Sequence, residues 1–214
     1  MTIKCVIFDM AGTTVEDNED VLKTLYYSLG MTKLHFDFNQ IKTLMGRDKR
    51  ETIGILLESK VEEIHARFEK LMISHYAENA KEVEGTTTYF TKLKSQGIKV
   101  ALTTGFPRAI ADVIINKLDW KNLVDISVCS DEVLCGRPYP HMIKKICRSL
   151  GIGSYDCIKV GDTTSDVWEG INSVCRQVYG VTTGNCSRKD FKEFLSKEQI
   201  KYTRIIDSLG EITI

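Results

Sequence analysis

The feature that most constrains the fold of this sequence is a repeated unit, a short apolar run that ends in a polar, glycine-containing loop. The first run is Cys5–Phe8, which ends at Asp9. A short apolar run bounded by turn signals is typical of a strand buried on both faces. Further runs of this kind predict strands at 98–102, 125–128, 157–160, 177–179 and 204–206.

Segments with helical spacing of apolar residues separate these runs. They predict helices at 88–96, 109–118, 141–150, 165–172 and 188–195. Strands that alternate with helices indicate an α/β fold, in which helices cover both faces of a parallel sheet. Ligands of such sheets bind beyond the carboxyl ends of the strands. We therefore expect the polar residues that follow the strands to converge on one site.

The stretch from about Asp17 to Glu82 differs from the rest of the chain. Its apolar residues recur at helical spacing and it contains no convincing strand. We predict an insert of roughly four helices placed after the first strand. The expected division is a core domain made of 1–16 and 84–214 and a helical domain at 17–83.

Composition limits the classes of partner. The 29 basic residues balance the 29 acidic ones, so no bulk field draws the chain to nucleic acid or to a membrane surface. No apolar run is long enough to span a bilayer, and the first residues lack the pattern of a secretion signal. The 7 cysteines include no C-x-x-C pair, which favours free thiols in a reducing compartment. We expect a cytoplasmic protein with no nucleic-acid or membrane partner.

Carboxylates stand at two of the predicted strand ends. Asp9 follows the first strand, and Asp162 and Asp166 lie in the loop that follows the strand at 157–160. If these carboxylates converge, they repel one another unless a cation joins them, and oxygen ligands suit Mg²⁺. A carboxylate can also attack phosphorus and form an aspartyl phosphate. Asp9 is therefore a candidate nucleophile as well as a candidate metal ligand.

Other residues at the strand ends could bind a phosphate group. The hydroxyls of Thr13 and Thr104 and the amides around Gly12 and Gly105 could hold its oxygens, and Arg137 could add a bidentate cation. Each of these residues alone is equally consistent with a turn or a helix cap. All of them together, in order, favour a site for phosphoryl transfer.

Four segments in order resemble the motifs of the haloacid dehalogenase superfamily, and the resemblance covers essentially the whole chain. The segments are VIFDMAGT at 6–13, VALTTG at 100–105, GRPYP at 136–140 and VGDTTSD at 160–166. The resemblance implies a Rossmann-like core, with the helical insert as its small cap domain. It also implies Asp9 as the nucleophile, and Mg²⁺ bound by Asp9, the backbone carbonyl of Ala11 and Asp162. Asp166 would support the metal through water.

Ala11 narrows the resemblance to one branch. Phosphatases of this superfamily usually carry a second aspartate at this position, and its acid–base work is worth about 10²–10⁴-fold. That aspartate protonates the leaving oxygen and later activates water, and an alanine can do neither. The form D-x-A-G-T-T and the arginine of GRPYP resemble the phosphonatase branch, the phosphonoacetaldehyde hydrolases and their relatives. That branch cleaves a carbon–phosphorus bond after a cap lysine forms a Schiff base with the substrate aldehyde.

The segment at 45–50 resembles the part of the cap that carries this lysine. Met45 and Gly46 match, as residues that would contact substrate, and Lys49 stands at the lysine position. A lysine amine must be neutral to attack a carbonyl, so the role requires a lowered pKa. The alternatives for Lys49 are a solvated lysine at the start of a helix, or a residue that only contacts substrate.

The sequence neighbours of Lys49 act in both directions on its pKa. The cations of Arg47 and Arg50 would lower it, whereas Asp48 and Glu51 would raise it.

The chain departs from the phosphonatase pattern in three respects. Thr52 stands where that branch has a histidine, Phe106 stands where it has a tyrosine, and the insert is somewhat shorter. These changes fit a phosphonatase-like relative with a different substrate as well as the phosphonatase itself.

Three interpretations follow from the sequence. The first is a phosphonatase-like hydrolase acting on a small phosphonate or phosphate compound, with the cap closing over the substrate. The second is a small-molecule phosphate monoester phosphatase, and the third is a catalytically weak relative with a binding or regulatory role. The resemblance also raises a homodimer paired through the caps as a prediction.

Overall fold

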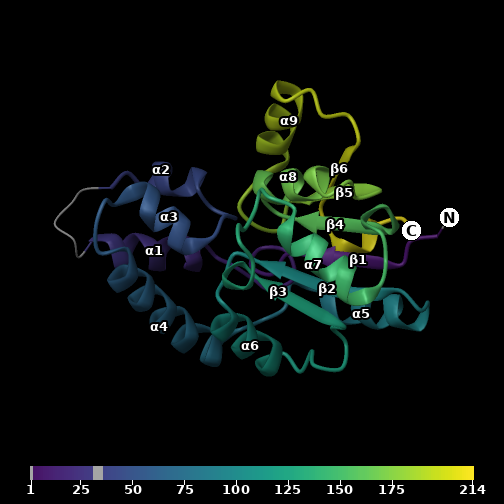
Figure 1. Ribbon diagram of the computed structural model, residues 1–214, viewed down its shortest axis with the longest axis horizontal. Helices are drawn as coiled ribbons and strands as arrows, with labels where there is room; N and C mark the ends of the chain where they lie inside the picture. The colour runs from purple at the N-terminus through teal and green to yellow at the C-terminus, as the bar shows by residue number, and fades with distance from the viewer. Residues whose placement is uncertain (1, 31–35) are drawn as a thin grey trace.

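The centre of the molecule is a sheet of 6 parallel strands, seen in a computed structural model that describes residues 2–30 and 36–214 (Figure 1). The strand order is β3-β2-β1-β4-β5-β6. The strands are β1 Cys5–Phe8, β2 Lys99–Thr104, β3 Ile126–Cys129, β4 Cys157–Gly161, β5 Gln177–Val181 and β6 Thr203–Ile206.

Every predicted strand is present, and the helices predicted between them agree to within a few residues. These helices are α5 Thr86–Ser95, α6 Arg108–Lys117, α7 His141–Leu150, α8 Thr164–Asn172 and α9 Arg188–Lys197. Short 3₁₀ turns lie at η1 Ser130–Glu132, η2 Ser154–Asp156 and η3 Leu209–Glu211. The predicted α/β class with a Rossmann-like parallel sheet is confirmed.

The two faces of the sheet are covered by different helices, as the alternation along β1 illustrates. Val6 and Phe8 belong to a buried cluster that includes apolar residues of α5 and α6. Cys5 and Ile7 point to the opposite face, where they join a cluster that includes residues of α7. Successive side chains of a strand point to opposite faces, so this strand is buried from both sides.

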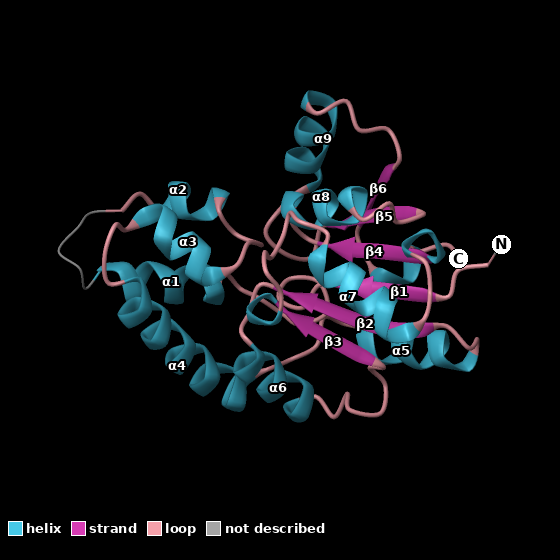
Figure 2. Cartoon of the chain, viewed as in Figure 1, coloured by secondary structure: helices cyan, strands magenta, loops and turns pink. Residues whose placement is uncertain are grey.

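Of the five helices described between β1 and β2, the first four form a group that precedes α5, and the described part of this segment contains no strand. These four are α1 Asp20–Gly30, α2 Phe38–Thr43, α3 Lys49–Leu56 and α4 Val61–Asn79. Figure 2 shows them as a group beside the sheet, on the side toward which the strand arrows point, and α4 packs against α6.

The segments that enter and leave this helical group lie side by side. An antiparallel bridge pairs Val15 with Glu82. The predicted domain boundaries at 17 and 83 stay a prediction, and residues 31–35 of the predicted insert lie outside the described residues.

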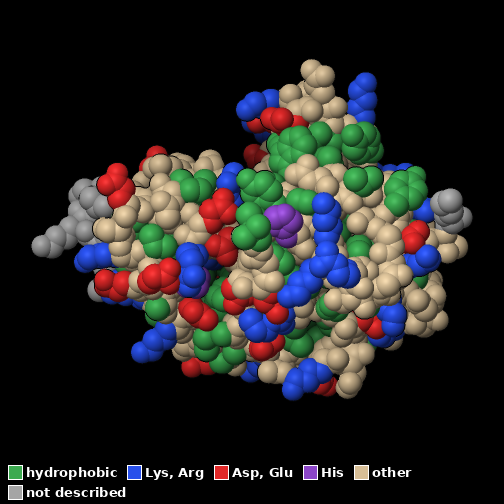
Figure 3. Space-filling view, in the orientation of Figure 1, with side chains coloured by type: hydrophobic (Ala, Val, Ile, Leu, Met, Phe, Trp, Pro, Cys, Tyr) green, Lys and Arg blue, Asp and Glu red, His purple; other side chains and the backbone are tan. Residues whose placement is uncertain are grey.

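The surface carries charges of both signs. Figure 3 shows acidic and basic side chains interspersed over one face, in keeping with the balanced composition. Within the described residues, no helix combines the length and the apolar character needed to cross a membrane.

Candidate active site

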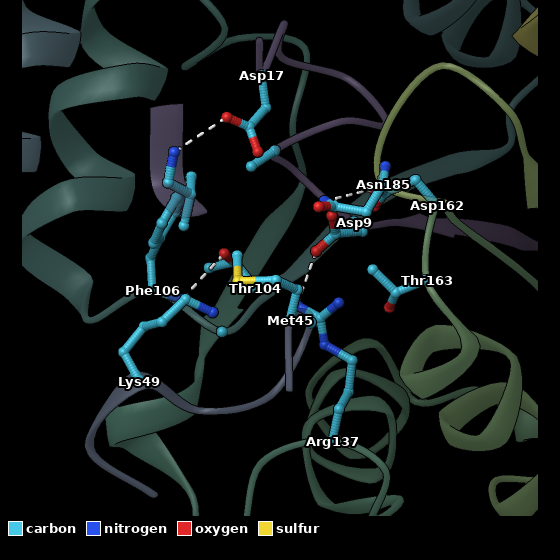
Figure 4. Close-up of a pocket in the computed structure, with 14 residues that line it drawn as sticks. Asp9, Asp17, Met45, Lys49, Thr104, Phe106, Arg137, Asp162, Thr163 and Asn185 are labelled. Atoms are coloured by element: carbon cyan, nitrogen blue, oxygen red, sulfur yellow. Dashed lines mark hydrogen bonds and ion pairs between the residues drawn. The ribbon is translucent and has the colours of Figure 1, made fainter. Parts of the chain in front are cut away.

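A small cavity of about 30 Å³ lies where the carboxyl ends of the strands meet the helical group (Figure 4). It draws residues from the segments that follow β1, β2, β3, β4 and β5 and from α1 and α3. Its lining consists of Asp9, Ala11, Asp17, Val21, Met45, Gly46, Lys49, Thr104, Gly105, Phe106, Arg137, Asp162, Thr163 and Asn185.

Asp9 and Arg137 form a buried ion pair in this cavity. Nη2 of Arg137 lies 2.7 Å from Oδ1 of Asp9, and Nη1 of the same guanidinium donates to Asp166. Figure 4 shows the Arg137 side chain directed toward Asp9. Burial raises the pKa of Asp9 to about 6, against the lowering effect of Arg137.

Three carboxylates converge at the end of the sheet, as predicted. One oxygen each of Asp9, Asp162 and Asp166 lies within 4.8 Å of the others. Asp162 follows β4, and its Oδ2 accepts hydrogen bonds from the backbone nitrogen and Nδ2 of Asn185, at 2.7 and 3.0 Å. Burial, and then repulsion by Asp9 and Asp166, raise the pKa of Asp162 well above its ordinary value. A cation between these oxygens would relieve that repulsion, so the three residues could hold a metal ion.

The charge of the surrounding buried cluster fits a divalent cation. The cluster consists of the acids Asp9, Asp162, Asp166 and Glu169 and the bases Arg137 and Lys159. Nζ of Lys159 lies 3.0 Å from Oδ1 of Asp166 and 2.9 Å from Oε2 of Glu169, with all three side chains inaccessible. The four carboxylates outnumber the two cations of the cluster, and with the buried ammonium of Lys49 in the same cavity the formal charge is −1, which is costly to bury unless it is compensated.

Lys49 enters the cavity from the start of α3. The side chain of Asp48 accepts from the backbone nitrogen of Glu51 at 2.7 Å and so begins the helix at Lys49. The Lys49 residue is 3% exposed, and its Nζ donates to the carbonyl oxygen of Arg47 at 2.9 Å. The interpretation of Lys49 as a solvated lysine is therefore wrong.

The pKa of Lys49 is lowered, but mainly by groups other than its sequence neighbours. Burial lowers it to about 8, and the guanidinium of Arg137 acts in the same direction. Arg47 and Arg50, which were expected to lower it, pair instead with Glu51 at 3.2 Å and with Glu62 at 3.0 Å. Asp48 opposes the shift, as expected.

Several other predicted site residues line the same cavity. Met45 and Gly46 reach it from the segment before α3, and Ala11 from the loop after β1. Thr104 and Gly105 lie at the end of β2, where Oγ1 of Thr104 accepts from the backbone nitrogen of Phe106 at 3.1 Å.

Gly12, Thr13 and Asp166 are not part of the lining. Oγ1 of Thr13 donates to Oδ1 of Asp162 at 3.3 Å. Gly12 has a φ of +85°, and a Cβ at this position would overlap the carboxylate of Asp162. Gly12 and Thr13 thus lie against Asp162, and their predicted contacts with phosphate stay a prediction.

The family of the chain follows from a comparison with known proteins. The model of the haloacid dehalogenase-like hydrolase family matches residues 6–181. The chain belongs to this family. The hydrolase is 28% identical over 243 residues to the phosphonoacetaldehyde hydrolase of Bacillus thuringiensis (strain Al Hakam), an alignment that covers 100% of this chain and 92% of the relative.

Solved structures show the same fold at lower identity. A phosphonoacetaldehyde hydrolase-like protein from Oleispira antarctica has a TM-score of 0.81 and 22% identity, with 99% of this hydrolase and 90% of that chain covered. A hydrolase from Pseudomonas syringae has a TM-score of 0.83 and 16% identity, with 96% and 94% covered. These structures agree in fold, and the match of the family model to residues 6–181 confirms the superfamily predicted from the four motifs.

Sequence reasoning missed three polar residues in the lining of this hydrolase. Thr163, Asn185 and Asp17 were not assigned to the site. Asn185 lies in the loop after β5, so the strand-end rule that identified Asp9 also applies to it. Asp17 gave no such signal because it was taken only as the start of the helical insert.

Proposed function

We propose that this hydrolase is a Mg²⁺-dependent, phosphonatase-like enzyme acting on a small phosphonate aldehyde. Asp9 would be its nucleophile and Lys49 its Schiff-base residue. The observation that carries the proposal is the burial of Lys49, 3% exposed, in the cavity that Asp9 also lines. The 28% identity to proteins named phosphonoacetaldehyde hydrolase supports the same substrate class.

The donor set fits Mg²⁺, because carboxylate and carbonyl oxygens are the ligands that this ion prefers. Asp9, Asp162 and the backbone carbonyl of Ala11 would hold the ion, with Asp166 in support. When bound, the ion would supply positive charge that offsets the negative charge of the phosphoryl oxygens.

Lys49 prepares the substrate for cleavage. Its neutral amine attacks the aldehyde carbon, and the former carbonyl oxygen takes one proton from the amine and one from an acid and leaves as water, so that an iminium remains. The iminium then accepts the electron pair of the carbon–phosphorus bond and becomes an enamine. This route needs no acid for an oxygen leaving group, which agrees with an alanine at position 11.

Asp9 receives the phosphoryl group. Its carboxylate oxygen attacks phosphorus as the carbon–phosphorus bond breaks, and water later hydrolyses the aspartyl phosphate. Arg137, 2.7 Å from Oδ1 of Asp9, can pair with the phosphoryl oxygens during this transfer. Protonation of the enamine carbon and hydrolysis of the resulting imine then release the aldehyde product and restore Lys49.

Phosphate release tests the proposal. The purified protein is assayed with Mg²⁺ on phosphonoacetaldehyde and on a panel of small phosphate monoesters, with Asp9→Ala as the blank. We expect release from phosphonoacetaldehyde that falls to the blank in Lys49→Arg, which keeps the charge but cannot form an imine. Lys70→Ala, which changes an exposed lysine on α4, is the matched control. Release from monoesters alone would overturn the proposal in favour of a phosphatase.

A further inference from the structure

One buried oxygen in the cavity has no partner. Oδ1 of Asp17 accepts from the backbone nitrogen of Val21 at 3.1 Å and so holds the first turn of α1. Oδ2 of the same carboxylate is buried and makes no hydrogen bond. Because leaving a buried acceptor unsatisfied costs about 1–3 kcal/mol, this oxygen is suited to receive a ligand atom. Asp17 lines the cavity together with Lys49 (Figure 4).

The other acidic side chains of the lining are already engaged. Oδ1 of Asp9 pairs with Arg137 at 2.7 Å, and Oδ2 of Asp162 accepts two hydrogen bonds from Asn185. Among the described acidic residues that line the cavity, Asp17 is thus the one with a buried carboxylate oxygen that has no hydrogen-bond partner.

Asp17 and Lys49 line the same cavity, and burial favours the neutral form of each. Burial raises the pKa of Asp17 and lowers that of Lys49 to about 8, and each charge favours the charged form of the other. Transfer of a proton from the ammonium to the carboxylate leaves two neutral groups and does not change the net charge of the cavity. A neutral amine together with a protonated acid is the pair that imine formation requires.

Building on the proposed function, we propose that Asp17 is the acid–base residue of Schiff-base formation. Its carboxylate takes a proton from Lys49, whose freed electron pair forms the nitrogen–carbon bond to the aldehyde. A second proton then passes from the nitrogen to the alkoxide oxygen and gives the hydroxyl of the carbinolamine, to which the protonated Asp17 donates the first proton. The carbon–oxygen bond breaks, water leaves, and the nitrogen electron pair completes the iminium. Asp17 returns to the carboxylate, so no other reactant is needed.

The variant Asp17→Asn isolates this role, because an asparagine oxygen can still accept the hydrogen bond from Val21. The measurement is the rate at which phosphonoacetaldehyde forms a borohydride-reducible adduct on Lys49 in a single turnover. We expect the rate to fall by about 10²–10⁴-fold. The matched control is Asp20→Asn. Asp20 lies in the first turn of α1, and its carboxylate lies 3.5 Å from Nε2 of His75. Added acetate should restore part of the rate in Asp17→Ala.

Two further outcomes separate the possible failures. If the wild type forms no adduct on Lys49, the proposed function fails and this proposal fails with it. If the wild type forms the adduct and folded Asp17→Asn matches its rate, only the role of Asp17 is overturned.

A purely structural role is tested through Tyr76, whose buried hydroxyl also lacks a partner and whose pKa is raised by burial and then by Asp17. Asp17 would act only through packing if two results held together. Tyr76→Phe would slow adduct formation as much as Asp17→Asn does, and acetate would not restore the rate of adduct formation in Asp17→Ala. An unchanged rate in Tyr76→Phe supports the proposal.

Discussion

Lys49 has an unusual environment for a lysine, and the reactivity of its amine should reflect this. Burial lowers its pKa from 10.5 to about 8, so the neutral form that attacks an aldehyde becomes dominant above about pH 8. In Asp17→Asn, where the Lys49 ammonium must lose its proton to solvent before the amine attacks, we predict that the rate of adduct formation rises with pH and reaches half its maximum near pH 8. Borohydride trapping between about pH 6 and 11 measures this. A half-maximum near 10.5 would show that the amine is solvated.

Arg137 makes contacts that a lysine cannot reproduce, because its planar fork reaches Asp9 and Asp166 at the same time. We predict that Arg137→Lys lowers kcat/KM by about 10²-fold, the usual cost of removing one preorganised donor. Steady-state kinetics measures the effect, with Arg188→Lys as the control, because this partly exposed arginine pairs with Asp207 away from the cavity. A loss of less than about threefold would show that the contacts of Arg137 do not contribute to phosphoryl transfer.

Single residues also show the limits of sequence reasoning. Asp9, Asp162 and Lys49 were found because they follow strands or match motifs, and the structure brings them to one cavity. The cause of the lowered pKa of Lys49 was not found, because burial and contact with Arg137 depend on how distant segments pack. Asp17 was missed for the same reason.

The contact between β4 and α8 contains a buried charge network that supports the site. Lys159 lies in the middle of β4 and pairs with Glu169 of α8, and its Nζ donates to Oγ1 of Thr103 at 2.6 Å. We predict that Lys159→Met destabilises the fold by about 3–5 kcal/mol, because it leaves buried carboxylates uncompensated.

The double variant Lys159→Met, Glu169→Met should lose less stability than the sum of the single variants, because each partner is costly without the other. Urea unfolding of the three variants measures the coupling. Additive losses would show that the pair contributes nothing as a pair.

The strands and helices themselves were largely predictable. Apolar runs such as Cys5–Phe8 fix strands that are buried on both faces, and the helix His141–Leu150 was predicted with its observed bounds. The apolar pattern did not predict the environment of Lys159. A lysine within an apolar run does not reveal whether it faces solvent or a buried carboxylate, since that depends on the helix packed above it.

The helical group packs closely against the loops at the carboxyl ends of the strands. A Cβ at Gly105 would collide with the carbonyl oxygen of Arg47, and one at Gly46 would collide with Thr163. The cavity of about 30 Å³ is far smaller than the roughly 150 Å³ that holds a benzene-sized ligand, and we therefore predict that the helical group moves when substrate enters.

This close fit predicts the effect of one methyl group. Gly105→Ala should hinder closure and lower kcat/KM by about 10²-fold, because a displacement of about 1 Å is enough to misalign reacting groups. The control is Gly54→Ala, where a Cβ meets nothing within 4 Å, and it should leave kinetics unchanged. Wild-type kinetics in Gly105→Ala would show that the tight contact is not needed for turnover.

The joint action of Asp9 and Lys49 on one substrate is tested most directly by locating the covalent adduct. Wild-type protein is incubated with phosphonoacetaldehyde and Mg²⁺, reduced with borohydride, digested and mapped by mass spectrometry. We predict a secondary amine on Lys49 in the wild type and in Asp9→Ala, with phosphate released only by the wild type. Phosphate release by a wild type that carries no modification on Lys49 would contradict the account.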